Sequence, residues 1–250
     1  MDLGLFELTI IGLAIFLSSI VQGAVGFAVA LIAVPLLLQA GLDLSQSIFV
    51  VLICGFVQNG LGLRQTWSET PIRQLTGWAV FRSLLVPVGF VLMRYIENYS
   101  KSELRQLFGM ILITVICLQL VFRVKPRPSV HWTWTTLAMT ISGVSQGMIG
   151  TPGPPIAFWV MAHDWESKRS RGTMYFLFLP GSLLQMVLLL IVFDWQTIRE
   201  SSLIGICGIP LSFAGASIGL WVGNRFDRKR IRLAIITTLV LLSLALILAP

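Results

Sequence analysis

The chain has few charged residues. Asp, Glu, Lys and Arg make up 12% of its 250 residues, about half their share in a typical soluble domain. Hydrophobic residues make up 56%, and the mean hydropathy is +0.85. These values predict an integral membrane protein. A chain of this length suffices for about eight spans with short loops, which leaves no room for a soluble domain.

The chain is also poor in cysteine and histidine, the residues of disulfide frameworks and metal sites. Cys54, Cys117 and Cys207 all lie in apolar runs without a Cys-x-x-Cys pair, and an odd number of such thiols argues against a disulfide framework. We expect them to be packing residues. His131 and His163 are the only histidines, and no phosphate-binding Gly-x-x-x-x-Gly-Lys-Ser/Thr loop occurs. We therefore expect no metal, no cofactor and no ATP hydrolysis.

Carboxylates are missing from the middle of the apolar runs. None of the eleven Asp and Glu residues lies there, which argues against a proton relay or sodium site built on buried acids. No nucleophile, base and orienting group meet at such a depth either, so we do not expect an enzyme. The N-terminus has no basic segment with a cleavage site, so no removable signal peptide is expected.

Apolar runs of near-spanning length occur seven times, and three shorter runs flank two breaks. About 20 residues are needed to cross a bilayer as a helix. The long runs are Leu3–Val21, Ser45–Leu63, Leu75–Met93, Leu104–Phe122, Thr173–Phe193, Ile198–Trp221 and Ile231–Leu248. The short runs are Phe27–Ala40, Thr133–Gln146 and Pro155–Ala162. The short runs suggest hairpins that enter the membrane and return, or helices broken within the protein.

The basic residues decide between these two arrangements. The formal net charge is +7, and the basic residues lie in short loops, which indicates membrane orientation rather than nucleic-acid binding. If each broken unit is a hairpin, thirteen Lys and Arg residues lie on one side and four on the other. If each unit crosses once, the division is eleven to six. Positive charge concentrates on the cytoplasmic side, so the hairpin arrangement is favoured, with both termini outside the cytoplasm.

The hairpin arrangement implies two inverted halves, because each half then holds one hairpin and three crossings. The predicted fold is an all-α integral membrane protein of about eight transmembrane helices in two inverted four-helix repeats. The first helix of each repeat is a broken or re-entrant hairpin. The repeats are 1–122 and 133–250, and a basic, proline-containing cytoplasmic linker, 123–132, joins them. The expected location is the cell inner (plasma) membrane, where inverted repeats support alternating access.

The two breaks share a motif, Gln-Gly-x-x-Gly. The first copy begins at Gln22 and reads QGAVGF; the second begins at Gln146 and reads QGMIGTPGPP. Helices broken at equivalent points of two repeats are the best sequence sign of a transporter's substrate site. Glycine permits a sharp turn, Thr151 can cap the new helix, and prolines suit a first helical turn.

Two helix starts of this kind predict a site for an anion, because their unpaired N–H groups and dipoles attract negative charge. The alternative is that the glycines only allow close helix packing. We expect a substrate site formed by Gly23, Gly26, Gly147, Gly150, Thr151, Gln22, Gln146 and Arg82. Arg82 is the only charged residue well inside a predicted span; it is either a counter-ion or a side chain that reaches the interface. Gln58, Asn59 and Gln185 either contact the anion or join helices.

The motifs resemble those of the TauE/SafE sulfite exporter family. The segment Ile20–Phe27, followed by Pro35-Leu36-Leu37, resembles the motif of the first repeat. The segment Ser145–Gly150, followed by Gly153-Pro154-Pro155, resembles that of the second. Ala28 stands where many members have a second glycine. The resemblance implies a membrane transporter of sulfur-containing or organic anions, such as sulfite, thiosulfate or sulfonates.

The function predicted from the motifs and the resemblance is export of a small anion across the bilayer. An inside-negative potential favours anion efflux by about 2.3 kcal/mol per charge per 100 mV, so export needs no coupling ion. Uptake driven by a proton is an alternative. Another is a lipid-phosphate translocase, which a lateral opening between helices would favour. An intramembrane enzyme or assembly factor would need a nucleophile such as Cys54 or Cys207. The oligomeric state is left open.

Overall fold

The apolar runs fold into helices, and the chain turns where glycine, proline or charged residues interrupt them. The computed structural model describes residues 4–121, 126–225, 237, 239–241 and 243–246. In these ranges the structure has no named strand; one isolated bridge joins Arg127 and His163. The helices, in chain order, are α1 (Leu5–Val25), α2 (Val29–Gln39), α3 (Leu44–Thr66), η1 (Trp67–Glu69), α4 (Ile72–Leu84), α5 (Val86–Ile96), α6 (Lys101–Val121), α7 (Trp132–Ile149), α8 (Gly153–Met161), α9 (Ser167–Val192) and α10 (Trp195–Arg225).

Five helical stretches of the described chain are long and apolar enough to cross a bilayer. They are Leu5–Val25, Leu44–Glu69, Ile72–Ile96, Ser167–Val192 and Trp195–Gly223. Each overlaps one of the long runs predicted from the sequence, so the structure confirms that these five runs form helical stretches of spanning length. The run 104–122 forms α6, which ends beside the undescribed residues 122–125. Most of the run 231–248 and the basic residues 228–232 lie outside the described residues.

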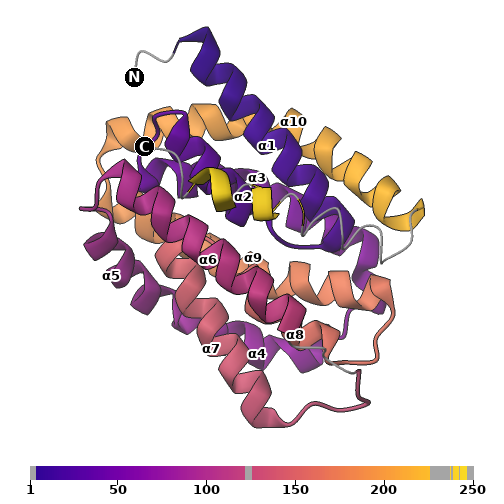
Figure 1. The fold of residues 1–250 in the computed structure, drawn as a ribbon. Helices are drawn as coiled ribbons and strands as arrows, with labels where there is room; N and C mark the ends of the chain where they lie inside the picture. The colour runs from indigo at the N-terminus through magenta and orange to yellow at the C-terminus, as the bar shows by residue number, and fades with distance from the viewer. Residues whose placement is uncertain (1–3, 122–125, 226–236, 238, 242, 247–250) are drawn as a thin grey trace.

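Helices from the two halves of the chain pack against each other in a reciprocal way. In Figure 1, α10 runs alongside α1, and both views place α3 next to α9. Helix α5, from the first half, packs closely on α7, from the second. Small residues allow this approach: a Cβ atom at Gly219 would overlap the carbonyl oxygen of Ile20, and one at Gly89 that of Val144. Each half therefore covers the broken helix of the other half.

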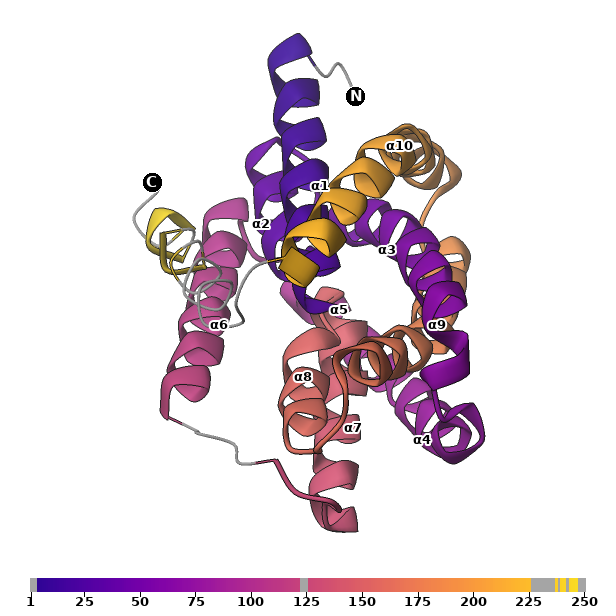
Figure 2. The same ribbon diagram turned by 90° about the vertical axis from the view of Figure 1, so that its right-hand side faces the viewer.

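The two short helices of the broken units, α2 and α8, lie within the helix packing. Helix α2 packs against α1, α3 and α6, and α8 packs against α7 and α9. Figure 2 shows α6 at the edge of the molecule, beside α2. The Phe27 side chain contacts both hydrophobic cores, one centred on α2 and α3 and the other on α8 and α9. The first break thus joins the two cores.

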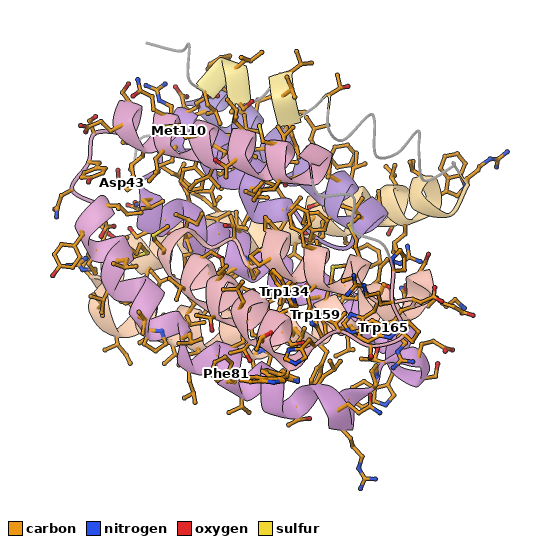
Figure 3. All side chains as sticks on the ribbon, turned by 60° about the horizontal axis from the view of Figure 1, so that its bottom comes forward. Asp43, Phe81, Met110, Trp134, Trp159 and Trp165 are labelled. Carbon is orange, nitrogen blue, oxygen red and sulfur yellow. The ribbon has the colours of Figure 1, made fainter. Side chains whose placement is uncertain are left out.

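The linker and the end of α8 meet at one place. Arg127 N–H donates to Ala162 O at 2.9 Å, and Asp164 N–H donates to Arg127 O at 3.2 Å. Beside this bridge, the His163 ring stacks on Trp165 with centroids 4.0 Å apart, and Trp159 packs edge-on against both rings. Figure 3 shows Trp159 and Trp165 at this end of the molecule. The α7–α8 unit therefore begins and ends at the same end of the helix packing.

Candidate functional site

The second glycine of each motif ends a helix. Gly26 follows α1 with φ 89°, and Gly150 follows α7 with φ 72°. Each N–H donates to the carbonyl of its motif glutamine: Gly26 to Gln22 at 2.6 Å and Gly150 to Gln146 at 2.8 Å. The left-handed region is accessible to glycine without a Cβ clash. The predicted sharp turns are therefore present at both glycines.

The first glycine of each motif lies inside the helix and serves its packing. A Cβ atom at Gly23 would overlap the carbonyl oxygen of Ala216 on α10, and one at Gly147 would overlap that of Val86 on α5. Neither glycine lies among the residues that line the cavity between the breaks. The alternative of close helix packing therefore describes their local geometry, and their contact with substrate stays a prediction.

The helix starts differ from each other more than the sequence suggested. Helix α2 begins after Ala28, which has φ 93°. The residue before α8 is Pro152, and no side chain caps that start. The prediction that Thr151 caps α8 is wrong, because Pro152 is the N-cap residue and no side chain hydrogen-bonds to the first turn. Proline carries no N–H, so Pro152, Pro154 and Pro155 also leave α8 with fewer free donors than α2.

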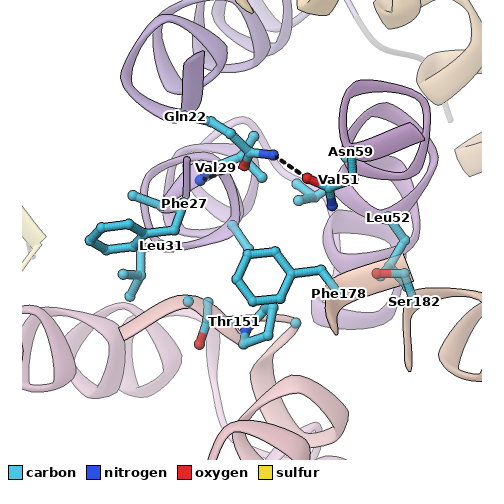
Figure 4. Close-up of a pocket in the computed structure, with 16 residues that line it drawn as sticks. Gln22, Phe27, Val29, Leu31, Val51, Leu52, Asn59, Thr151, Phe178 and Ser182 are labelled. Carbon is cyan, nitrogen blue, oxygen red and sulfur yellow. Dashed lines mark hydrogen bonds between the residues drawn. The ribbon is translucent and has the colours of Figure 1, made fainter. Parts of the chain in front are cut away.

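A cavity with about 420 Å³ of empty space lies between the two breaks (Figure 4). Its walls come from the first break and α2, the second break, α3 and α9. The lining residues are Gln22, Phe27, Ala28, Val29, Ala30, Leu31, Val51, Leu52, Gly55, Asn59, Gly150, Thr151, Pro152, Gly153, Phe178 and Ser182. Of the predicted site residues, Gln22, Gly150 and Thr151 line this central cavity; Gly26 instead packs near Met174 and Arg171.

Arg82 lies buried directly behind the wall of the central cavity. Its Nε donates to Ser142 Oγ at 2.8 Å, its Nη1 to Leu177 O at 2.7 Å, and its Nη2 to Gln146 Oε1. The guanidinium also lies over the Phe178 ring, 5.6 Å from the centroid. The alternative that Arg82 reaches the interface is wrong, because its side chain has 0% exposure.

Among the described residues, Arg82 is the only charged side chain that is buried. All its hydrogen-bond partners are neutral, so its charge has no carboxylate beside it. A buried charge is costly unless it is compensated, and an ionisable residue inside a membrane protein marks a functional site by default. The arrangement supplies positive potential to the adjacent cavity.

The two motif glutamines make matching hydrogen bonds. Gln22 Nε2 donates to Asn59 Oδ1 on α3 at 3.0 Å, and Gln146 Nε2 donates to Ser182 Oγ on α9 at 3.0 Å. Gln22 Oε1 also accepts from the N–H of Val29, in the first turn of α2, at 3.2 Å. Through Ser182, Gln146 connects Arg82 to the cavity wall. Both glutamines therefore belong to the polar lining or to the layer directly behind it.

The other amides at depth join helices. Gln58 Nε2 donates to Ser212 O at 2.9 Å, and Gln185 Nε2 donates to Gly147 O at 3.1 Å. Neither lines the central cavity, whereas Asn59 does. Sequence reasoning missed Ser142, Phe178 and Ser182, because isolated serine and phenylalanine residues in apolar helices give no sign of which helix they face.

The structure also bears on the predicted absence of metal and disulfide chemistry. Cys54, Cys117 and Cys207 are free, and only Cys54 is buried. The packing interpretation therefore fits Cys54 better than the two exposed thiols. In the described part of the chain, no three His, Cys, Asp or Glu side chains form a group that could hold a metal ion.

The comparison that decides the family covers nearly the whole chain. The family model described as Sulfite exporter TauE/SafE matches residues 11–246, a range that includes both motifs, Arg82 and all walls of the cavity. The chain belongs to the TauE/SafE family. No curated protein and no solved structure shows a significant match. Membership in the TauE/SafE family, together with the five apolar helical stretches, identifies a multi-pass membrane transporter.

Proposed function

We propose that this TauE/SafE protein exports small sulfur-containing or organic anions, such as sulfite, thiosulfate and sulfonates, through the central cavity. The observation that carries the proposal is the buried Arg82, whose charge has only neutral partners and lies behind the wall of the cavity. An anion in the cavity would compensate that charge. The start of α2 adds N–H groups and a positive dipole end.

Alternating access between inverted repeats is the proposed mechanism. Three matches between the halves support it: the left-handed glycines, the paired glutamines and the reciprocal packing of α10 on α1 and α5 on α7. The bridge between Arg127 and the end of α8 supports a hairpin whose two ends emerge on one side. In this proposal, the α1–α2 and α7–α8 units enter the membrane from opposite sides.

Flux in proteoliposomes tests the proposal. Radiolabelled sulfite, thiosulfate and methanesulfonate are offered with an imposed membrane potential, since an anion exporter without a coupling ion should respond to potential. We expect Arg82→Gln to lower the flux at least about tenfold, which corresponds to about 1.4 kcal/mol. The matched control is Arg94→Gln, which removes an exposed arginine paired with Glu97 at 3.0 Å and should leave the flux unchanged.

Two outcomes would contradict the proposal. Flux that is indifferent to potential but rises with a pH gradient would favour proton-driven uptake. Absence of flux for all three anions, with folded protein in the liposomes, would favour the lipid-phosphate alternative, and translocation of labelled phosphatidic acid in the same liposomes would then measure it.

A further inference from the structure

A second cavity lies beside the first and shares only Gln22 with it. It is enclosed by α1, α3, α9 and α10 and also holds about 420 Å³ of empty space. Its lining residues are Gln22, Gly23, Gln58, Leu61, Gly62, Gln65, Tyr175, Phe213, Ala216, Ser217 and Leu220. The buried Gln22 therefore borders both cavities.

The second cavity leads from the central site toward one end of the molecule. Along α3, the central cavity is lined by residues between Val51 and Asn59, and the second by residues between Gln58 and Gln65. Helix α3 ends at Thr66, so the second cavity lies next to the end that carries Arg64. Gln65 and Ser217 on its walls are exposed. The two cavities thus follow each other along α3, from the buried site toward the surface.

The interior of the second cavity holds a polar group without a partner. Gln58 is 7% exposed, and its Oε1 accepts no hydrogen bond in the described structure. A buried acceptor left unpaired costs about 1–3 kcal/mol. The cavity is therefore suited to a molecule that brings a donor, such as water or the hydroxyl group of a protonated oxyanion.

Both ends of the Gln22 side-chain amide are hydrogen-bonded at the place where the two cavities meet. Its Nε2 donates to Asn59 Oδ1 on α3 at 3.0 Å (Figure 4). Its Oε1 accepts from the N–H of Val29 at 3.2 Å. That N–H belongs to the first turn of α2, where an anion would bind. The side-chain oxygen Oε1 of Gln22 thus occupies the position that an oxygen of the substrate would take.

We propose that Gln22 is a gate between the central site and a second binding position in the cavity lined by Gln58, Gln65, Tyr175 and Ser217. The inference rests on the proposed anion transport. An oxyanion that binds the N–H of Val29 displaces the Gln22 oxygen. The released side chain loses its place beside Asn59 and opens the path to the Arg64 end. Substrate binding and opening are thereby the same event.

Accessibility of two engineered cysteines tests the gate in the full-length protein. In a background with Cys54, Cys117 and Cys207 replaced by serine, Ser217→Cys reports on the second cavity and Val51→Cys on the central one. The probe is the impermeant anionic reagent 2-sulfonatoethyl methanethiosulfonate, applied from the Arg64 side. With Gln22 present, Val51→Cys should react at least about tenfold more slowly than Ser217→Cys, since a barrier of about 1.4 kcal/mol gives that ratio.

Opening the gate should raise the labelling rate of Val51→Cys and leave the labelling rate of Ser217→Cys unchanged. Gln22→Ala and, independently, Asn59→Ala should each raise the Val51→Cys rate at least about tenfold and leave that of Ser217→Cys within about twofold. Gln74→Ala, which removes an exposed side-chain amide on α4 outside both cavities, should alter neither rate. Two substitutions from opposite sides of the bond keep the test valid if one of them fails to fold.

Different results would overturn the proposed gate and the proposed transport function. Equal rates for Val51→Cys with and without the Gln22–Asn59 bond would overturn the gate, whatever the liposomes transport. The expected rates without flux of any sulfur anion would support the gate and overturn the proposed substrate. Slower labelling of Ser217→Cys in the presence of methanesulfonate would support the second binding position; labelling unaffected by saturating methanesulfonate would overturn it.

Discussion

Ala28 has a backbone conformation that residues other than glycine rarely adopt. Its φ is 93°, and it is the only non-glycine residue with positive φ in the described chain. A left-handed conformation costs an L-residue about 1–2 kcal/mol. The first break of this chain therefore keeps the turn at a cost in stability, which a substitution can reveal.

Ala28→Gly should raise the free energy of unfolding by several tenths to about 1 kcal/mol. Relief of about 1–2 kcal/mol of strain exceeds the loss of one buried methyl group, about 0.8 kcal/mol. Denaturant unfolding in detergent measures the change. Ala30→Gly, two residues further and inside α2, should lower the same quantity by about 1 kcal/mol. Equal losses for both variants would show that Ala28 is not strained.

His163 makes stability depend on pH at the junction of the linker and α8. Burial against Trp159 and Trp165 lowers the pKa of His163; the Trp159 carbonyl opposes this shift, and Arg169 adds to it. The unfolded chain then binds the proton more readily than the folded one, so stability is complete above about pH 6.5 and decreases as the pH falls below it.

We expect the midpoint of thermal unfolding to decrease between pH 7 and pH 5, and His163→Phe to reduce this decrease. Phenylalanine keeps an aromatic ring beside Trp165 and does not titrate. Trp134→Phe, at an exposed aromatic position on α7, serves as the control and should keep the wild-type profile. An unchanged profile in His163→Phe would assign the pH dependence to other groups.

At the scale of helices, small residues set the approach of one half to the other. The sequence predicted the positions of the helices and both breaks, because hydropathy and glycine act locally along the chain. It did not show that Gly23 and Gly147 belong to the helix packing, or that α8 begins after Thr151. Those outcomes depend on the neighbouring helix and on where the first turn can close.

Gly147→Ala should lower the free energy of unfolding by about 1–3 kcal/mol, the usual cost of overpacking. Its Cβ atom would overlap the Val86 carbonyl on α5, a backbone atom that cannot rotate away. Gly77→Ala on α4 meets nothing within 4 Å and should instead raise that free energy by about 0.5–1 kcal/mol. The pair is compared by unfolding in detergent. A neutral Gly147→Ala would mean that α5 and α7 can separate freely.

At the scale of the whole molecule, the distribution of basic residues predicts how the protein is oriented in the membrane. The described bridge at Arg127 joins the linker to the end of α8. Helices α4 and α5 form the stretch Ile72–Ile96, which is long enough to cross a bilayer. The loop between α5 and α6 follows this stretch and lies at the other end of it from the α3–α4 loop. The positive-inside rule predicts that the linker faces the cytoplasm and that this loop faces the outside.

Labelling of single cysteines in intact cells measures this orientation. In the cysteine-free background, Asn98→Cys should react with an impermeant maleimide added outside, and Ser129→Cys should react only after the membrane is permeabilised. Both positions are exposed. Labelling of Ser129→Cys from outside would show that the topology is the reverse of the predicted one. In that case the membrane potential would drive the anion through the two cavities in the opposite order.

The sequence by itself determined the membrane class, five helical stretches of spanning length, the two breaks and the family. Each depends on properties that recur along the chain, such as hydropathy, glycine and proline. Only the tertiary structure decided which polar groups meet. Arg82 and Ser142 are 60 residues apart, and Gln22 and Asn59 are 37 apart. Their pairing depends on the rotation and depth of packed helices, which helical periodicity alone leaves open.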